Sequence, residues 1–250
     1  MSEFIFMLTR DDVTVGDALE RYAEVRGSGL RWVGFKDVGL PYEQLRTLAD
    51  AIHADDRKVA LEVVSLDRDS EVRSAEAALE IGVDLLMGGV HPEAVLPLVA
   101  PTNVLYFPFP GRVVGHPSIL EGSVDEIAAS ARRLTAQRGI HGVDLLAYRF
   151  AGDVPQLMDA VVAASVGPVV VAGSVDSDER IRAVKRSGAW AFTVGSAVFD
   201  HAFPTSVSAA AQVDYVLDVV RSPGGSWPLP LDSSNSGLPG APASRAPSKA

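Results

Sequence analysis

Eight short apolar segments, each followed by a longer amphipathic segment, constrain the fold of this chain more than any other feature. Most are near-continuous runs of Val, Leu, Ile and Phe, which is typical of parallel strands buried on both faces. We expect strands at residues 4–8, 31–36, 58–64, 83–87, 103–107, 143–148, 168–172 and 191–194.

The segments between the expected strands have the periodicity of helices. Apolar residues recur on one face of residues 17–26, 42–53 and 70–81, and a further helix is expected at 177–187. Ser123 precedes Glu126 by three residues, the spacing of a capping box at a helix start. Repeated alternation of strand and helix predicts a parallel sheet with crossover helices.

Length favours closure of this sheet into a barrel. A (β/α)8 barrel typically takes about 250 residues, and the chain has 250. No Gly-x-Gly-x-x-Gly follows an early strand, which weakens the dinucleotide-binding alternative. We therefore expect one (β/α)8 TIM barrel over residues 1–221. Residues 222–250 are rich in Pro, Ser, Gly and Ala and lack apolar periodicity, so we expect a disordered tail there.

Composition excludes several classes of function. The chain has no cysteine, which rules out thiolate nucleophiles and cysteine-ligated metals. Its net charge of −10 provides no general attraction to nucleic acid or anionic lipid, and we expect neither as a partner. No apolar run approaches the ~20 residues of a membrane span, and no secretory signal is visible. We expect a cytoplasmic protein and leave a homo-oligomer open.

Two Gly-Ser pairs follow the last two expected strands. Gly173 and Ser174 lie between a strand and a helix, and Gly195 and Ser196 end the final strand. Glycine lets backbone N–H groups approach a ligand, and a helix N-terminus favours an anion. Barrels commonly hold phosphate at these two loops. The simpler interpretation is that the glycines only form tight turns.

Residues 169–199, VVVAGSVDSDERIRAVKRSGAWAFTVGSAVF, resemble the paired phosphate-binding loops of the ribulose-phosphate-binding barrel superfamily. That superfamily includes phosphoribosyl isomerases, indole-glycerol-phosphate synthase, the tryptophan synthase α subunit and sugar-phosphate epimerases. The resemblance implies phosphate contacts at Gly173, Ser174, Gly195 and Ser196. It does not select one member of the superfamily.

Charged residues inside two apolar strands are the candidate catalytic groups. Lys36 ends the second expected strand and Glu62 lies within the third. Catalytic groups of barrels come from strand ends, and adjacent strands could bring this pair together. Burial lowers the pKa of a lysine, which could then act as base or Schiff-base nucleophile, and raises that of a glutamate, which could carry protons. A purely structural ion pair is the alternative.

Other candidates follow the remaining strands. The long apolar stretch 106–118 carries Arg112 and His116, which could bind an anion and act as acid or base; a lid or subunit contact is the alternative. Further candidate substrate-binding positions at strand ends are Arg10, Gly88, Gly89 and Tyr148.

Gly-Val-Asp-Leu-Leu occurs twice, at residues 82–86 and 142–146. We place both aspartates, Asp84 and Asp144, at the lower rim of the barrel, away from any site. Histidines and carboxylates form no spacing typical of a metal site, so we predict no cofactor and leave a divalent metal open.

These features predict an enzyme that binds a small phosphorylated metabolite. Isomerisation, epimerisation or aldol-type cleavage next to a carbonyl needs proton transfer and a cation that stabilises an enediol or enamine. Lys36 and Glu62 supply a cation and a carboxylate. The alternative is a non-catalytic barrel that senses a phosphorylated metabolite or serves as a partner subunit. Flavin or pyridoxal phosphate chemistry on the same loops is a third, less favoured interpretation.

Overall fold

The chain folds as a (β/α)8 barrel, as the sequence predicted. A computed structural model describes residues 2–222. Eight parallel strands pair in the order β10-β11-β12-β1-β4-β5-β6-β7. Their bounds are β1 (Glu3–Met7), β4 (Trp32–Lys36), β5 (Lys58–Val63), β6 (Leu85–Gly88), β7 (Leu105–Phe107), β10 (Val143–Leu145), β11 (Val169–Val171) and β12 (Ala191–Val194).

The barrel is nearly closed between β7 and β10, the two ends of the strand order. Two backbone hydrogen bonds cross this seam. The His141 N–H donates to the Tyr106 carbonyl over 3.0 Å, and the Asp144 N–H to the Pro108 carbonyl over 3.2 Å. The expected sixth strand, 143–148, is shorter than predicted because residues Ala147–Arg149 form a 3-10 turn, η1.

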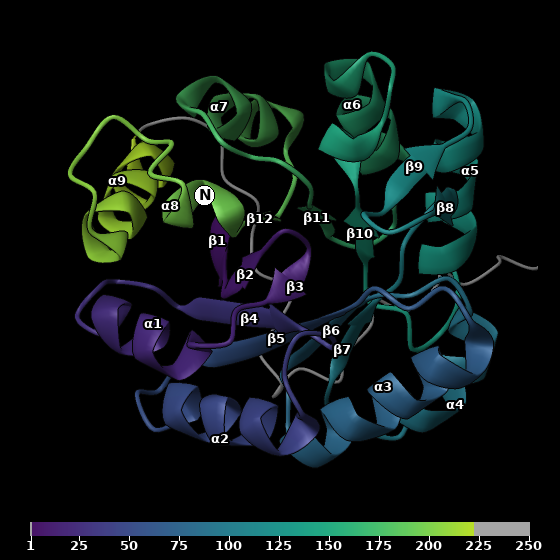
Figure 1. Cartoon of the computed structure of the whole chain (residues 1–250). Coiled ribbons are helices and arrows are strands. Elements are labelled where there is room, and N and C mark those ends of the chain that lie inside the picture. The colour runs from purple at the N-terminus through teal and green to yellow at the C-terminus, as the bar shows by residue number, and fades with distance from the viewer. Residues whose placement is uncertain (1, 223–250) are drawn as a thin grey trace, which may run out of the picture.

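Helices surround the strands on all sides (Figure 1). They are α1 (Ala18–Val25), α2 (Tyr42–His53), α3 (Arg68–Ile81), α4 (Pro92–Val99), α5 (Val124–Thr135), α6 (Val154–Ala164), α7 (Asp178–Ser187), α8 (Ser196–Phe199) and α9 (Ala209–Arg221). The predicted capping box is present: Ser123 accepts from the Glu126 N–H, and the Glu126 carboxylate accepts from the Ser123 N–H. Capping of this kind satisfies N–H groups that have no partner in the first helical turn.

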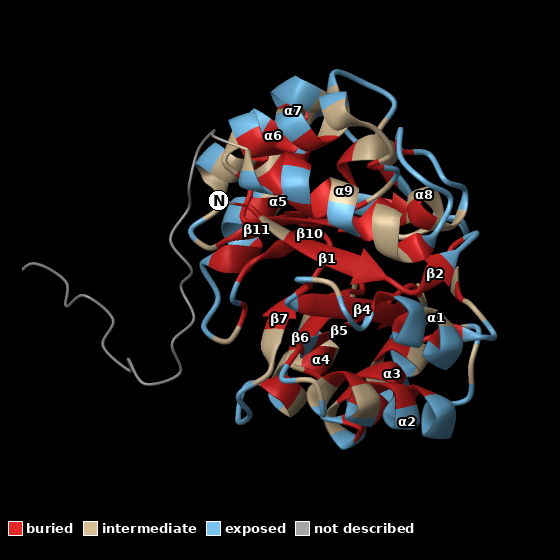
Figure 2. Cartoon of the chain, turned by 90° about the vertical axis from the view of Figure 1, so that its left-hand side faces the viewer, coloured by how far each residue is buried: buried red, intermediate tan, exposed pale blue. Residues whose placement is uncertain are grey.

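Apolar side chains form two layers, one inside the barrel and one between strands and helices. The barrel strands are buried except at their first residues, whereas the helices expose their outer faces (Figure 2). The inner layer consists of Ile5, Met7, Trp32, Ala60, Leu85, Met87, Phe107, Val170, Trp190 and Ala191. Successive residues of a strand point to opposite faces, so alternate residues pack into the inner and the outer layer. Because both layers are apolar, the strands are continuous apolar runs in the sequence.

Two short antiparallel hairpins were not expected from the sequence. One consists of β2 (Thr9–Arg10) and β3 (Val13–Thr14), directly after the first barrel strand. The other consists of β8 (Arg112–Val114), within the stretch expected to be a long loop, and β9 (Ile119–Glu121), directly after it. Both follow the carboxyl ends of barrel strands, where barrel active sites lie.

Within residues 2–222, no helix is both long enough and apolar enough to span a membrane. The tail expected at 222–250 lies, apart from Ser222, outside the described residues.

Candidate functional site

A cavity of about 300 Å³ opens at the carboxyl ends of the barrel strands. Both candidate catalytic residues and both Gly-Ser pairs line it, although they come from opposite halves of the sequence. The lining residues are Met7, Thr9, Asp12, Lys36, Glu62, Ser118, Leu146, Arg149, Gly173, Ser174, Val175, Asp176, Thr193, Gly195, Ser196, Ala197, Asp200 and Ala202.

Lys36 and Glu62 are neighbours across adjacent strands. They are register partners of β4 and β5, and Lys36 Nζ lies 3.1 Å from Glu62 Oε1. The first hairpin holds the lysine backbone. Thr14 Oγ1 donates to the Lys36 carbonyl over 2.9 Å and accepts from the Lys36 N–H over 2.8 Å. The lysine is therefore fixed at the end of its strand by a side chain from the neighbouring hairpin.

Asp12 completes a buried ion triad with this pair. Its Oδ1 lies 2.5 Å from Lys36 Nζ, so the ammonium sits between two carboxylates. The side chains of Lys36, Asp12 and Glu62 are only 8%, 6% and 4% exposed. Charges this deeply buried interact strongly because little water screens them.

The triad has a distinct protonation pattern. Burial alone would lower the pKa of Lys36, but the carboxylates of Glu62 and Asp12 outweigh it and raise that pKa above its usual value. The expected fall is therefore wrong, and Lys36 is a firmly held ammonium. Burial would raise the pKa of Asp12, yet Lys36 and Arg149 hold it below its usual value. Burial raises the pKa of Glu62, which Lys36 only partly offsets.

Asp12 also joins three further parts of the chain. Arg149 Nη2 lies 3.4 Å from its Oδ1, the Ser118 N–H donates to its Oδ2 over 3.4 Å, and His116 Nδ1 is 3.8 Å from that same oxygen. Asp12 itself has a φ of +68°, a left-handed conformation that aspartate tolerates better than most residues. Sequence reasoning named its neighbour Arg10 and missed Asp12, although acidic residues directly after a barrel strand were a usable signal.

The two Gly-Ser corners require glycine for backbone reasons. Gly173 has a φ of +103°, and a Cβ on Gly195 would come within 2.5 Å of Thr9 Oγ1. Among the hydrogen bonds of residues 2–222, none uses the N–H groups of Gly173, Ser174, Gly195 or Ser196. The four residues that carry these unengaged donors line the cavity.

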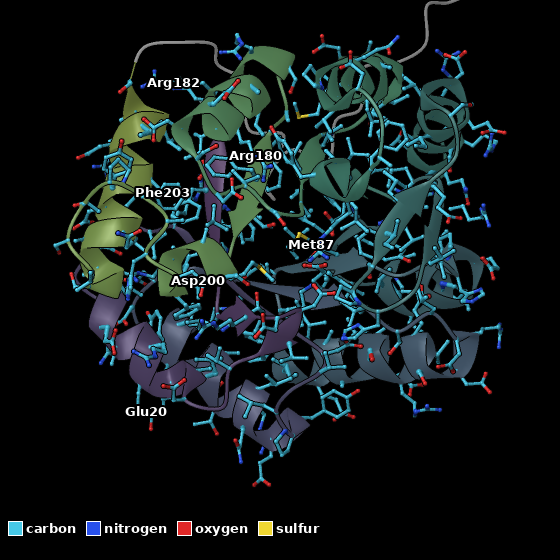
Figure 3. The ribbon with its side chains drawn as sticks, turned by 45° about the horizontal axis from the view of Figure 1, so that its top comes forward. Glu20, Met87, Arg180, Arg182, Asp200 and Phe203 are labelled. Carbon is cyan, nitrogen blue, oxygen red and sulfur yellow. The ribbon has the colours of Figure 1, made fainter. Side chains whose placement is uncertain are left out.

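Two carboxylates lie near these corners, and each has its own arginine. Asp176 pairs with Arg180 over 2.9 Å, and Asp200 with Arg10 over 2.7 Å. Figure 3 shows Arg180 on α7 and Asp200 just after α8. Arg10, a candidate substrate-binding residue, therefore pairs with Asp200 and does not itself line the cavity.

The remaining predicted substrate-binding residues do not line the cavity. Arg112 is largely exposed and pairs with Glu121 across the second hairpin, and His116 is an exposed residue at the hairpin tip. The Tyr148 ring stacks on the Arg180 guanidinium 4.8 Å away. Gly88 and Gly89 also lie outside the lining, and close packing explains why both are glycine. A Cβ on Gly88 would collide with the Val63 carbonyl, and a Cβ on Gly89 with the Glu71 carboxylate.

Asp144 does not lie at the lower rim, where the sequence pattern had placed it. It pairs in register with Val170 of the inner layer, while both its neighbours belong to the outer layer. The side chain therefore points into the barrel. It is fully buried, and neither carboxylate oxygen has a hydrogen-bond partner in the described part of the chain. Burial raises its pKa well above the usual range, with the charge of Glu62 adding to the effect. Within that same part, no His, Cys, Asp or Glu cluster is suited to hold a metal.

Comparison with known proteins identifies the fold and no family. No family model and no curated protein matches the sequence. Orotidine 5'-phosphate decarboxylase from Pyrococcus horikoshii OT3 superposes with a TM-score of 0.61 at 14% identity, covering 87% of this chain and 99% of that one. Tryptophan synthase from M. tuberculosis superposes with a TM-score of 0.60 at 16% identity, covering 87% of this chain and 92% of that one.

A monomeric form of phosphoribosylanthranilate isomerase from Thermotoga maritima also gives a TM-score of 0.60, at 14% identity and with 88% and 99% of the two chains covered. At such identities the likeness demonstrates the shared barrel.

Proposed function

We propose that this protein is an enzyme that transfers a proton next to the carbonyl of a small sugar phosphate, as an isomerase or epimerase does. One observation carries the proposal: a single cavity is lined both by the triad of Asp12, Lys36 and Glu62 and by the two Gly-Ser corners. A volume of about 300 Å³ is at the small end for ligand pockets. It suits a compact substrate.

The triad supplies the groups that this chemistry needs. The Glu62 carboxylate would take the proton from the carbon next to the carbonyl, and the C–H electrons would move to form an enediolate. The ammonium of Lys36 would stabilise the oxyanion, and Glu62 would return the proton. A raised pKa makes Glu62 a stronger base than an ordinary glutamate. Because Lys36 stays protonated, proton transfer is favoured over aldolase chemistry through an imine, which needs a neutral amine.

The Gly-Ser corners would hold the phosphate. The unengaged N–H groups of Gly173, Ser174, Gly195 and Ser196 are donors of the kind that bind anions in backbone loops. The structural neighbours support the same ligand class, since two of them are named for phosphorylated compounds.

A binding-only barrel is the alternative. It is favoured by the completeness of the triad, in which Lys36 already has two carboxylate partners without any ligand. Such a protein would bind the same sugar phosphates and leave them unchanged.

Deuterium exchange separates these functions even when the product is unidentified. Sugar phosphates with three to five carbons, such as dihydroxyacetone phosphate and ribulose 5-phosphate, are incubated with the protein in D2O and followed by NMR. We expect deuterium at the carbon next to the carbonyl of at least one compound. Glu62→Gln should reduce the exchange rate by about 100-fold or more and preserve phosphate binding.

Asp84→Asn is the matched control, because Asp84 is a carboxylate with its own lysine at the opposite end of the barrel. It should exchange at the wild-type rate. Cleavage of a sugar into two carbonyl fragments would support a lyase instead. Binding without exchange or cleavage of any compound would support the binding-only barrel and contradict the proposal.

A further inference from the structure

Arg149 has no part in the function proposed above, yet it lies inside the same cavity. It ends the 3-10 turn that follows β10, and its side chain is 28% exposed. The stem passes next to the first Gly-Ser corner, because a Cβ on Gly173 would lie 3.4 Å from Arg149 Cγ. The guanidinium reaches towards Asp12. Arg149 therefore spans the distance between the Gly-Ser corner and the triad.

The guanidinium has donors to spare. Its single hydrogen bond within residues 2–222 runs from Nη2 to Asp12 over 3.4 Å, which is long for a charged pair. A guanidinium carries five N–H donors in a planar fork and has no acceptor. The remaining donors border a cavity in which a ligand with several acceptor oxygens can satisfy them.

The charges around the cavity make a free cation necessary for anion binding. In the described part of the chain, the cations that line the cavity are Lys36 and Arg149, and Lys36 is already held by two carboxylates. Asp176 and Asp200 also line the cavity and oppose an incoming anion. Backbone N–H groups offer only partial charges, so a phosphate dianion still needs a full positive charge close by.

We propose that Arg149 binds the substrate phosphate together with the two Gly-Ser corners. Among residues 2–222 it is the only cation lining the cavity that is not already saturated by carboxylates. The guanidinium fork matches two phosphate oxygens at once, whereas an ammonium acts as a point charge. This inference rests on the function proposed above and names a residue that phosphate binding there requires.

Binding of inorganic phosphate and of glycerol 3-phosphate tests the inference by calorimetry. We expect Arg149→Met to weaken both about tenfold or more, the size of effect expected for a hydrogen bond to a charged group. Arg149→Lys keeps the charge and loses the fork, so its affinities should fall between those of wild type and Arg149→Met. Both variants should fold, because the side chain is partly exposed and makes one long contact.

Arg182→Met is the matched control for charge alone. Arg182 lies on α7 (Figure 3). It is about half exposed and is not among the residues that line the cavity. The Arg182→Met variant should bind inorganic phosphate and glycerol 3-phosphate with wild-type affinity. An unchanged phosphate affinity in Arg149→Met overturns the inference, as does an equal loss in Arg182→Met. A loss confined to glycerol 3-phosphate also overturns it, since Arg149 would then contact the carbon chain. Failure of the wild-type protein to bind phosphate would instead remove the proposed function itself.

Discussion

The same five residues, Gly-Val-Asp-Leu-Leu, occur twice in this chain and place their aspartates in opposite environments. Asp84 lies at the lower rim, where it accepts hydrogen bonds from Lys58 Nζ and the Val59 N–H and lies 2.9 Å from His53 Nε2. Asp144 lies inside the barrel and has no partner among residues 2–222. Despite partial burial, Lys58, Val59 and His53 lower the pKa of Asp84, whereas burial raises the pKa of Asp144 well above its usual range.

The two copies face the sheet differently at the aspartate and at the leucine that follows it. In the first copy Leu85 belongs to the inner layer, whereas in the second copy its counterpart Leu145 belongs to the outer layer. Because successive side chains of a strand alternate between faces, Asp144 points to the face opposite Leu145, which is the inside of the barrel. The aspartate that remains at the rim in one copy is therefore driven into the barrel in the other.

The two ends of this barrel have similar charged residues and differ in how deeply these residues are buried. Each end has a lysine bound to carboxylates. Lys58, the partner of Asp84, is 49% exposed, whereas Lys36, whose charge also acts on Asp144, is 8% exposed. Water screens the first and largely not the second. The next three experiments test this contrast.

Removal of the two lysines should give the largest difference. Lys36→Met leaves Asp12 and Glu62 buried without their cation and should cost about 3–5 kcal/mol of unfolding free energy at pH 7. Lys58→Met removes a half-exposed partner of Asp84 and should cost about 1 kcal/mol or less. Urea unfolding of both variants measures the difference. Similar losses would contradict the contrast, because they would show that burial does not strengthen the interactions of Lys36 relative to those of Lys58.

Asp144→Asn should change the pH dependence of stability. The unfolded aspartate ionises near pH 4, whereas the buried one keeps its proton to a higher pH. Stability therefore falls as pH rises between these two values, by about 1.4 kcal/mol per unit. Asparagine cannot ionise. Above about pH 4 the unfolding free energy of the variant should therefore rise relative to that of the wild type by about 1.4 kcal/mol for each pH unit. Parallel curves of unfolding free energy from pH 4 to 7 would mean that Asp144 is ionised in the native protein.

Asp84→Asn should have the smallest effect and the opposite sign. The pKa of Asp84 is lowered, so its contribution to stability is present above about pH 4 and is lost as the pH falls through the native value. We expect the unfolding free energy of the variant to be about 0.5–1 kcal/mol lower than that of the wild type at pH 7. The loss is small because the cationic partners of Asp84 are partly solvated. The difference from wild type should vanish at low pH. A loss that persists below pH 3 would point to packing instead of charge.

Much of the fold was predictable because it depends on local patterns. All eight expected strands are present, and the bounds of the last one, 191–194, agree with the structure. Helix α2 was predicted to the residue, and the cap at Ser123 is present. The hairpins at Thr9–Thr14 and Arg112–Glu121 were missed because their strands have two or three residues, too few for periodicity to be visible.

The candidate site was predictable only where its residues break a pattern. Lys36 and Glu62 stood out as charges within apolar strands, and the Gly-Ser pairs stood out by their place after strands. Asp12 and Arg149 also follow strand ends, but neither interrupts an apolar strand, so the pattern that distinguished Lys36 and Glu62 does not apply to them. They were found through their shared contact.

Apolar periodicity and strand order depend on neighbours along the chain, and they predicted the barrel, the positions of the two Gly-Ser corners and the placement of Lys36 and Glu62 on adjacent strands. Only the tertiary structure decided the third member of the triad, the protonation of Lys36 and the side of the sheet on which Asp144 lies. These depend on the distance between residues far apart in sequence and on exclusion of water, and the five residues repeated around Asp84 and Asp144 contain no information about either.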